Sequence, residues 1–116
     1  RINPSSHVDA NDLITELILY MEHHYDRDIS LDELAQLVGL SREYMCSLFK
    51  KTMKQTIMHY LLTIRISRAR EFLIRFPEKK ILEIAKMCGF ESPSYFGKKF
   101  KLETGMTPDA FRKKLG

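Results

Sequence analysis

One pattern of residues occurs twice within the 116 residues of this chain. The shared positions are Leu34-Ala35, Gly39, Tyr44 and Phe49-Lys50 in the first copy, and Ile84-Ala85, Gly89, Tyr95 and Phe100-Lys101 in the second. The offset is 50 residues up to the glycine and 51 after it, because the second copy has one more residue in its turn. Each copy has the pattern of a short helix, a tight turn and a second helix with a polar outer face. The repeat therefore predicts two helix-turn-helix units, each with a second helix that can lie in a DNA major groove.

Start and stop signals delimit these helices. Ser30 and Glu33 form a capping box before the first helix, and Gly39 ends it. Ser41 and Ser92 begin the second helix of the two copies. Sustained alternation of apolar and polar residues, which is typical of strands, is absent. The sequence therefore predicts an all-α fold of about seven helices, in which a long linker helix joins the two helix-turn-helix units.

These signals divide the chain into four predicted segments. They are residues 1–8 as a linker from a missing N-terminal region, 9–55 as the first helix-turn-helix subdomain, 56–76 as a linker helix, and 77–116 as the second helix-turn-helix subdomain. A helix from about residue 56 to residue 75 would be about 30 Å long. Successive major grooves on one face of B-DNA are about 34 Å apart. The linker helix is therefore predicted to set the distance between two reading helices.

Charge is distributed unevenly along the chain. Residues 1–38 hold 2 Lys or Arg against 8 Asp or Glu, whereas residues 39–116 hold 17 against 7. This asymmetry indicates a polyanionic partner for the basic part, and the alternative is a basic surface that is simply solvated. In the acidic part, Ile14, Leu17 and Met21 form an apolar stripe. That stripe predicts a supporting helix that faces away from any nucleic acid.

Several kinds of function are not expected from the composition. No apolar run approaches the about 18 residues needed to span a bilayer, so no membrane association is predicted. Cys46 and Cys88 cannot form a disulfide framework, which favours a reducing compartment and a cytoplasmic location. His23 and His24 are neighbours that point in different directions on a helix, so they cannot chelate one ion together. The sequence therefore predicts no metal site and no cofactor.

Helical phase separates a buried face from an outward face in the second helix of each copy. The residues predicted to be buried are Tyr44, Met45, Leu48, Phe49, Tyr95, Phe96 and Phe100. The outward residues predicted to read DNA bases are Arg42, Glu43, Cys46, Ser47, Ser94, Gly97 and Lys98. The residues predicted to contact the DNA backbone are Ser41, Lys50, Lys51, Ser92 and Lys101. A polar helix face is usually just solvated, but its occurrence at matched positions in both copies favours DNA reading.

The chemistry of these side chains suits groove reading. Glu43 can accept a hydrogen bond from a cytosine amino group, and serine hydroxyls can bond to several bases. Lysine ammonium groups neutralise phosphates or approach guanine as point charges. The second copy offers fewer directional groups, because Gly97 has no side chain and Lys98 is a point charge. We therefore predict that the half-site under the first unit has the sharper base preference.

With these residues identified, the sequence resembles the DNA-binding domain of the AraC/XylS family of bacterial transcription regulators. The second unit carries the family signature at Ile84-Ala85, Gly89-Phe90, Tyr95-Phe96, Phe100-Lys101, Gly105, Thr107-Pro108 and Phe111-Arg112. The first unit matches at Leu34-Ala35, Gly39, Ser41, Leu48-Phe49-Lys50 and Tyr60-Leu61. The resemblance implies seven helices and binding to double-stranded promoter DNA, usually to activate transcription. It also implies RNA polymerase as a partner and a missing N-terminal sensor, dimerisation or receiver domain.

The chain departs from the family pattern at two positions. Lys54 stands where the family usually has glycine, which predicts that the first reading helix ends less sharply. Lys98 stands where many members have arginine, so bidentate recognition of guanine is not expected there. Arg65 matches an arginine that is common in the family's linker helix, and a structural role is predicted for it rather than a DNA contact.

Two other classes of function compete with DNA binding. The same helices can form a protein-interaction module that contacts RNA polymerase or a sensor domain, with incidental DNA binding. Some DNA alkylation-repair enzymes also resemble this domain and use a reactive cysteine. Cys46 is the outward candidate for such a role, but no neighbouring base or metal cluster is predicted to activate it. The sequence therefore predicts a binding protein rather than an enzyme.

Overall fold

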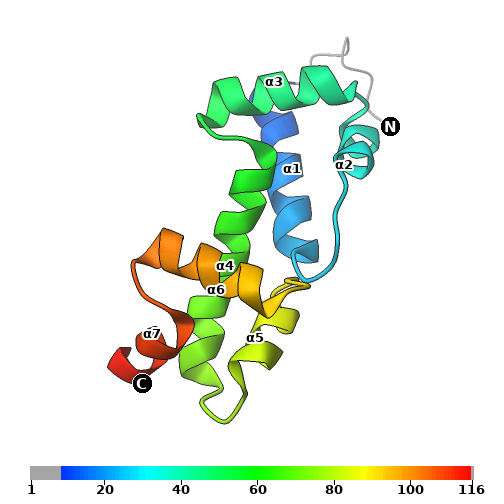
Figure 1. Cartoon of the computed structure of the whole chain (residues 1–116). Coiled ribbons are helices and arrows are strands. Elements are labelled where there is room, and N and C mark those ends of the chain that lie inside the picture. Colours follow the sequence, from blue (N-terminus) through cyan, green and yellow to red (C-terminus); the bar gives the residue numbers. More distant parts are fainter. Residues whose placement is uncertain (1–8, 116) are drawn as a thin grey trace. The chain divides into compact units, whose positions relative to one another are not determined.

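The structure, a computed structural model, describes residues 9–115, and the predicted linker at residues 1–8 lies outside them. The described residues form seven α-helices and no β-strand, which confirms the predicted all-α fold (Figure 1). In chain order the helices are α1 (Ala10–His24), α2 (Leu31–Val38), α3 (Arg42–Met53), α4 (Ile57–Arg75), α5 (Ile81–Met87), α6 (Pro93–Thr104) and α7 (Pro108–Leu115). Tertiary contacts divide these residues into two compact units.

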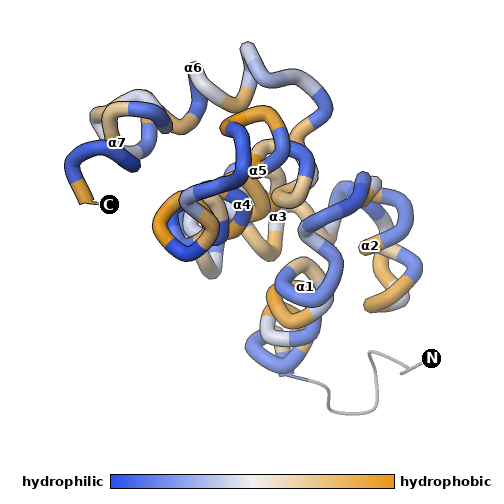
Figure 2. The backbone as a smooth tube through the Cα atoms, turned by 90° about the horizontal axis from the view of Figure 1, so that it is seen from below, coloured by the Kyte–Doolittle hydropathy of each residue, from blue (hydrophilic) through white to orange (hydrophobic). Residues whose placement is uncertain are grey.

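The first unit contains α1, α2, α3 and the start of α4, as far as Leu61. Its supporting helix, α1, buries an apolar stripe composed of Leu13, Ile14, Leu17 and Met21. Figure 2 shows how hydrophobic and hydrophilic residues alternate along this helix. α1 packs against both α2 and α3. Burial of this stripe therefore supports the first helix-turn-helix unit from its apolar side.

Capping side chains fix where α2 and α3 begin. The hydroxyl oxygen of Ser30 accepts a hydrogen bond from the Glu33 amide at 3.0 Å. The hydroxyl oxygen of Ser41 accepts one from the Tyr44 amide at 3.1 Å. The Glu33 carboxylate also accepts a hydrogen bond from the Tyr20 hydroxyl, which ties α2 to α1. Both helices of the unit therefore start at the serines predicted from the sequence.

α3 ends at a lysine in the left-handed backbone conformation. Lys54 has φ 63° and ψ 21°, and its amide donates a hydrogen bond to the Lys50 carbonyl oxygen at 2.8 Å. Gly105 ends α6 in the same way, with a bond to the Lys101 carbonyl oxygen at 2.7 Å. The prediction that α3 ends less sharply is therefore wrong. The hydrogen bond holds the turn even though the lysine adopts a conformation that favours glycine.

We expect Lys54→Gly to raise the free energy of unfolding by about 0.5–1 kcal/mol, because glycine adopts positive φ without a steric cost. The greater freedom of glycine in the unfolded chain offsets part of the gain. Urea denaturation at an unchanged m-value measures the difference. Lys51→Gly, inside α3, is the matched control and should destabilise the protein by about 1 kcal/mol. A loss of stability with both variants would contradict strain at Lys54.

The second unit contains Tyr25–Arg27 and the chain from Leu62 onward, with the rest of α4 and α5, α6 and α7. Its core includes a row of aromatic rings. The ring centroids of Phe90 and Phe96 are 4.9 Å apart, and Phe96 and Phe100 are 5.6 Å apart. Phe111 of α7 continues the row at 5.4 Å from Phe100. These distances suit favourable tilted ring contacts, so the row joins α6 and α7 to the turn after α5.

Arg112 of α7 closes the C-terminal end of α4. Its guanidinium nitrogens donate to the carbonyl oxygens of Leu73, Phe76 and Lys79, at 3.0, 3.1 and 2.7 Å. The last carbonyl groups of a helix have no partner within the helix. A cation at this end also interacts favourably with the helix dipole. Arg112 therefore stabilises the end of α4 and holds α7 against it.

Arg65 and Gly89 together hold the segment that follows α1. Arg65 donates from Nε to the Tyr25 carbonyl oxygen at 2.8 Å and from Nη2 to the Arg27 carbonyl oxygen at 2.8 Å. Gly89 has φ +89°, and a Cβ atom built on it would lie 2.3 Å from the same Tyr25 oxygen. Arg65 thus has a structural role here, and Gly89 provides the space for the Tyr25 carbonyl group.

Candidate nucleic-acid interface

A row of side chains occupies the same helical positions on α3 and on α6. Residues at i, i+3, i+4 and i+7 share one face of a helix. We call these two sets the outer stripes: Glu43, Cys46, Ser47 and Lys50 on α3, and Ser94, Gly97, Lys98 and Lys101 on α6. Counted from the capping serines, the two stripes have identical registers. Within each unit, the fold therefore brings most of the predicted base-reading residues together on one face.

Burial separates the outer stripes from the core. The opposite face of the helices is fully buried, through Met45 and Phe49 on α3 and Phe96 and Phe100 on α6. The exposed residues among those predicted to contact DNA are Ser41, Arg42, Glu43, Ser47, Lys50, Lys51, Ser92, Ser94, Lys98 and Lys101. The other two, Cys46 and Gly97, are partly buried. The predicted outward face is therefore accessible along nearly its whole length.

A serine hydroxyl caps the N-terminus of both helices. The Ser92 hydroxyl oxygen accepts a hydrogen bond from the Tyr95 amide at 3.2 Å, as Ser41 does from Tyr44. A serine that accepts such a bond still has its O–H available to donate. The positive end of the helix dipole lies at the same place. Each helix N-terminus therefore suits contact with a phosphate group.

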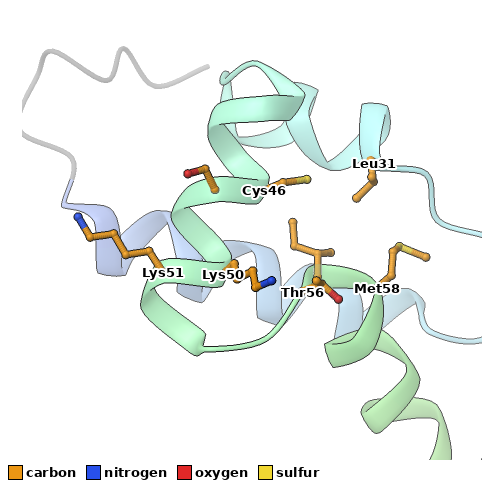
Figure 3. Close-up of a pocket in the computed structure, with 8 residues that line it drawn as sticks. Leu31, Cys46, Lys50, Lys51, Thr56 and Met58 are labelled. Carbon is orange, nitrogen blue, oxygen red and sulfur yellow. The ribbon is translucent and has the colours of Figure 1, made fainter.

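The sequence predicted that Cys46 points outward, but in the structure it is partly buried. It lines an open, mostly apolar pocket of about 500 Å³. Figure 3 shows its sulfur directed toward Leu31, with Thr56 and Met58 on the other side of the pocket and Lys51 pointing away. The reason is tertiary packing, because Leu31 of α2 and Ile57 and Met58 of α4 line the same pocket as Cys46. Cys46 therefore lies at the edge of the outer stripe, and its thiol lines the apolar pocket.

Arg42 is held by an acidic neighbour in the free protein. Its Nη1 atom lies 3.4 Å from Oδ1 of Asp32, and both side chains are largely exposed. An exposed ion pair of this kind contributes at most about 1 kcal/mol. A phosphate or base edge can therefore replace Asp32 at little cost.

Tyr44 and Tyr95 are not in the core, and this part of the sequence prediction is wrong. Tyr44 is 57% exposed and Tyr95 is 50% exposed. Both residues precede a fully buried residue by one position, so they lie at the edge of the apolar face rather than at its centre. Tyrosine tolerates such an edge because its ring is apolar while its hydroxyl requires a polar partner. Leu48 is likewise only partly buried.

The two thiols should differ strongly in reactivity. Cys88 is fully buried, and this burial raises the pKa of its thiol to about 12 despite the nearby Arg65 and Arg68. Since the thiolate is the reactive form, we expect alkylation of Cys88 at pH 8 to be about a thousandfold slower than that of a free thiol. Cys46 should react first, and bound DNA should slow its reaction. Mass spectrometry of the iodoacetamide-treated native chain measures both rates. Faster labelling of Cys88 would contradict the packing around it.

Two further features bear on the kind of site. Within residues 9–115, no group of three or more His, Cys, Asp or Glu side chains is arranged to hold a metal ion. In the same range, no helix is both long enough and apolar enough to cross a membrane. The two outer stripes present hydrogen-bonding groups, the ammonium groups of Lys50, Lys98 and Lys101, and the carboxylate of Glu43.

Known proteins share this architecture. A family model described as a helix-turn-helix domain matches residues 34–114. An uncharacterized HTH-type transcriptional regulator from the cgkA 5' region of Pseudoalteromonas carrageenovora is 34% identical over 103 residues, covering 89% of this chain and 60% of that protein. An AraC-type transcriptional regulator from Chromobacterium violaceum superposes with a TM-score of 0.85 at 30% identity, covering 92% of this chain and 95% of that one. The C-terminal domain of AraT, a response regulator from Geobacillus stearothermophilus, superposes with a TM-score of 0.83 at 26% identity. The superposition covers 98% of this chain and 88% of that one.

The fold, the two outer stripes and these likenesses define a DNA-binding domain with two helix-turn-helix units. The chain belongs to the AraC family of transcription regulators, as its sequence motifs predicted. As such a domain, it binds DNA in a sequence-specific manner. The chain spans between 29% and 60% of the length of the first three curated relatives that it matches.

Proposed function

We propose that α3 and α6 enter two adjacent major grooves of promoter DNA, each reading one half-site, and that this binding activates transcription. The observation that carries the proposal is the identical register of the two outer stripes behind identically capped N-termini. A major groove is about 12 Å wide and admits one α-helix. A single chain with two such helices can therefore occupy two grooves without dimerising.

The residues of α3, of α6 and of their serine caps have different roles in this proposal. Those that face base edges are Arg42, Glu43, Cys46, Ser47, Ser94, Gly97 and Lys98. Those that contact the DNA backbone are Ser41, Lys50, Lys51, Ser92 and Lys101. The carboxylate of Glu43 accepts a hydrogen bond from a cytosine amino group. The partly buried Cys46 presents a weakly polar thiol, which suits the apolar methyl group of thymine. Lysine side chains neutralise phosphates and contribute affinity without sequence preference.

The linker helix supports the two-groove proposal through its length. α4 is continuous over 19 residues, which corresponds to about 28 Å. Successive major grooves on one face of B-DNA are about 34 Å apart. A helix of this length therefore suits a protein that reads both grooves.

The wider setting of the domain is also a proposal. The AraT structure is that of the C-terminal domain of a response regulator, and the chain covers only part of its curated relatives. We therefore propose that a sensor, dimerisation or receiver domain precedes it and that RNA polymerase is its partner at the promoter. Both cysteines are free thiols, which supports the cytoplasm as its location. Contact with promoter DNA, rather than catalysis, is the proposed activity.

Footprinting on a duplex selected from a random pool tests the two-groove arrangement. We expect protection of two adjacent major grooves on one face by a monomer. Binding should weaken steeply with salt, because phosphate neutralisation releases counterions. Protection of only half a turn would contradict reading by α6, and salt-independent binding would favour the protein-interaction module.

Single substitutions separate base reading from backbone contact. Glu43→Ala and Ser47→Ala should relax base preference, whereas Lys101→Ala should weaken binding to all sequences alike and reduce the salt slope by about one. Selection from a random pool with each variant, followed by salt titration, measures both effects. A changed consensus with Lys101→Ala but not with Glu43→Ala would reverse these assignments.

A further inference from the structure

The two reading helices agree at some exposed positions and differ at others. Aligned from the capping serine, the exposed positions that agree are Ser41 with Ser92, Tyr44 with Tyr95, and Lys50 with Lys101. The outer-stripe positions that differ are Glu43 with Ser94, Cys46 with Gly97, and Ser47 with Lys98. The proposed base-reading positions of the stripes therefore all differ, while a second set of exposed side chains is common to both helices.

Residues common to both helices are suited to a task that both half-sites share. A residue that distinguishes bases must match one particular sequence. The sugar-phosphate backbone, in contrast, is chemically the same at every half-site, and contacts to it fix the orientation of a protein on DNA. Serine and lysine at the common positions already have that chemistry. The tyrosines are the common residues that the proposed function leaves unused.

The tyrosine hydroxyls are free to bind a partner outside the domain. Among the residues that the structure describes, neither phenolic oxygen has a hydrogen-bond partner. More than half of Tyr44 and half of Tyr95 are accessible, although tyrosine is a large, partly apolar residue. The Tyr95 ring is nevertheless supported, since its centroid lies 5.5 Å from Nζ of Lys99 and 6.2 Å from the Phe90 centroid. An exposed ring with a free O–H thus recurs at one register.

Helical geometry directs both tyrosines to the side of the reading face. Successive residues are about 100° apart around a helix, so the third position after the cap lies about a quarter turn from the centre of the outer stripe. When the stripe faces the floor of a major groove, this flank faces a groove wall. The walls of the groove carry the phosphates.

We infer that Tyr44 and Tyr95 donate their phenolic O–H groups to DNA phosphates on the wall of each major groove. They act as a matched pair of positioning residues that set both helices in the same orientation. The inference rests on the proposed insertion of α3 and α6 into major grooves. In this arrangement, neutral hydrogen-bond donors contact the phosphates in addition to the lysine ammonium groups. The tyrosines thus have a role on the surface, instead of the place in the core that the sequence predicted.

Tyr44→Phe and Tyr95→Phe test the inference because they remove only the hydroxyl oxygen. Each variant should bind the selected duplex about tenfold more weakly, as expected for loss of a hydrogen bond to a charged group. The consensus sequence should not change. The salt slope should also stay constant, because a neutral donor releases no counterion. Tyr60→Phe is the matched control, since its half-buried ring packs against Phe49 at 5.7 Å, and its affinity should equal that of the unmodified chain.

Duplexes with single methylphosphonate substitutions identify the acceptor. At one phosphate in each half-site, the neutral substitution should weaken the unmodified chain but not further weaken the corresponding tyrosine variant. Unchanged affinity of both variants, or additive losses at every phosphate, would overturn the inference. An altered consensus would also overturn it, by showing that the tyrosines read bases. A chain that bound no duplex would refute the proposed function as well, whereas salt-dependent binding that ignored both hydroxyls would refute the inference alone.

Discussion

Replacing Gly89 with alanine is expected to lower the free energy of unfolding by about 3–5 kcal/mol, combining backbone strain with overpacking. The new Cβ atom would lie 2.3 Å from the Tyr25 carbonyl oxygen and 3.0 Å from Nε of Arg65, at φ +89°. The carbonyl group must move, which also disturbs its hydrogen bond from Arg65. Such a loss is a large fraction of the stability of a small domain. Urea denaturation followed by circular dichroism measures it.

Gly105→Ala is the matched control for this experiment. Gly105 has a nearly equal φ of +85°, but a Cβ atom there would meet no other atom within 4 Å. The substitution should therefore cost only the backbone strain, about 1–2 kcal/mol. Equal losses at the two positions would show that the clash with Tyr25 is not the cause.

The second large effect concerns which unit carries the sequence preference. Scrambling the half-site under α3 should weaken binding about a hundredfold, and scrambling the half-site under α6 only about tenfold, at about 1–3 kcal/mol for each good pair lost. The α3 stripe offers three groups of different hydrogen-bonding character, Glu43, Cys46 and Ser47. Titrations with each scrambled duplex measure the losses. An equal or larger loss for the α6 half-site would show that Ser94 and Lys98 distinguish bases at least as sharply as the α3 stripe does.

Gly97→Ala gives an independent measure of how closely α6 approaches DNA. A Cβ atom at this position meets no atom of the protein within 4 Å. Alanine should therefore raise the free energy of unfolding by up to about 1 kcal/mol through its helix propensity. If α6 lies close against the groove, the same methyl group should lower affinity. A stabler variant with unchanged affinity would show that the glycine is not a point of close approach.

Local signals in the sequence were sufficient to predict the helices. Capping serines such as Ser30, Ser41 and Ser92 act through the first turn alone, so their effect does not depend on distant residues. The apolar positions of α1 and of the reading helices could likewise be assigned from helical phase. The repetition of a polar face at matched positions then favoured DNA reading over an ordinary solvated surface. For these reasons the fold class and most of the exposed residues of the outer stripes were predictable.

Other features depend on tertiary context and could not be read from the sequence. Whether Tyr44 and Tyr95 are covered depends on how neighbouring helices meet the edge of the apolar face. The partial burial of Cys46 depends on the pocket formed with α2 and α4. Arg112 reaches its three carbonyl partners only when α7 packs on the end of α4. A hydroxyl group in an otherwise apolar stripe was the available signal for the two tyrosines.

The assignment of Tyr25–Arg27 to the second unit has a consequence for how the chain can be divided. These residues lie in sequence between α1 and α2, but Arg65 holds two of their carbonyl groups. The polypeptide therefore passes from one unit to the other three times, after residues 24, 27 and 61. No single cut in the backbone can release both units intact. Neither compact unit is therefore a single continuous segment of the chain.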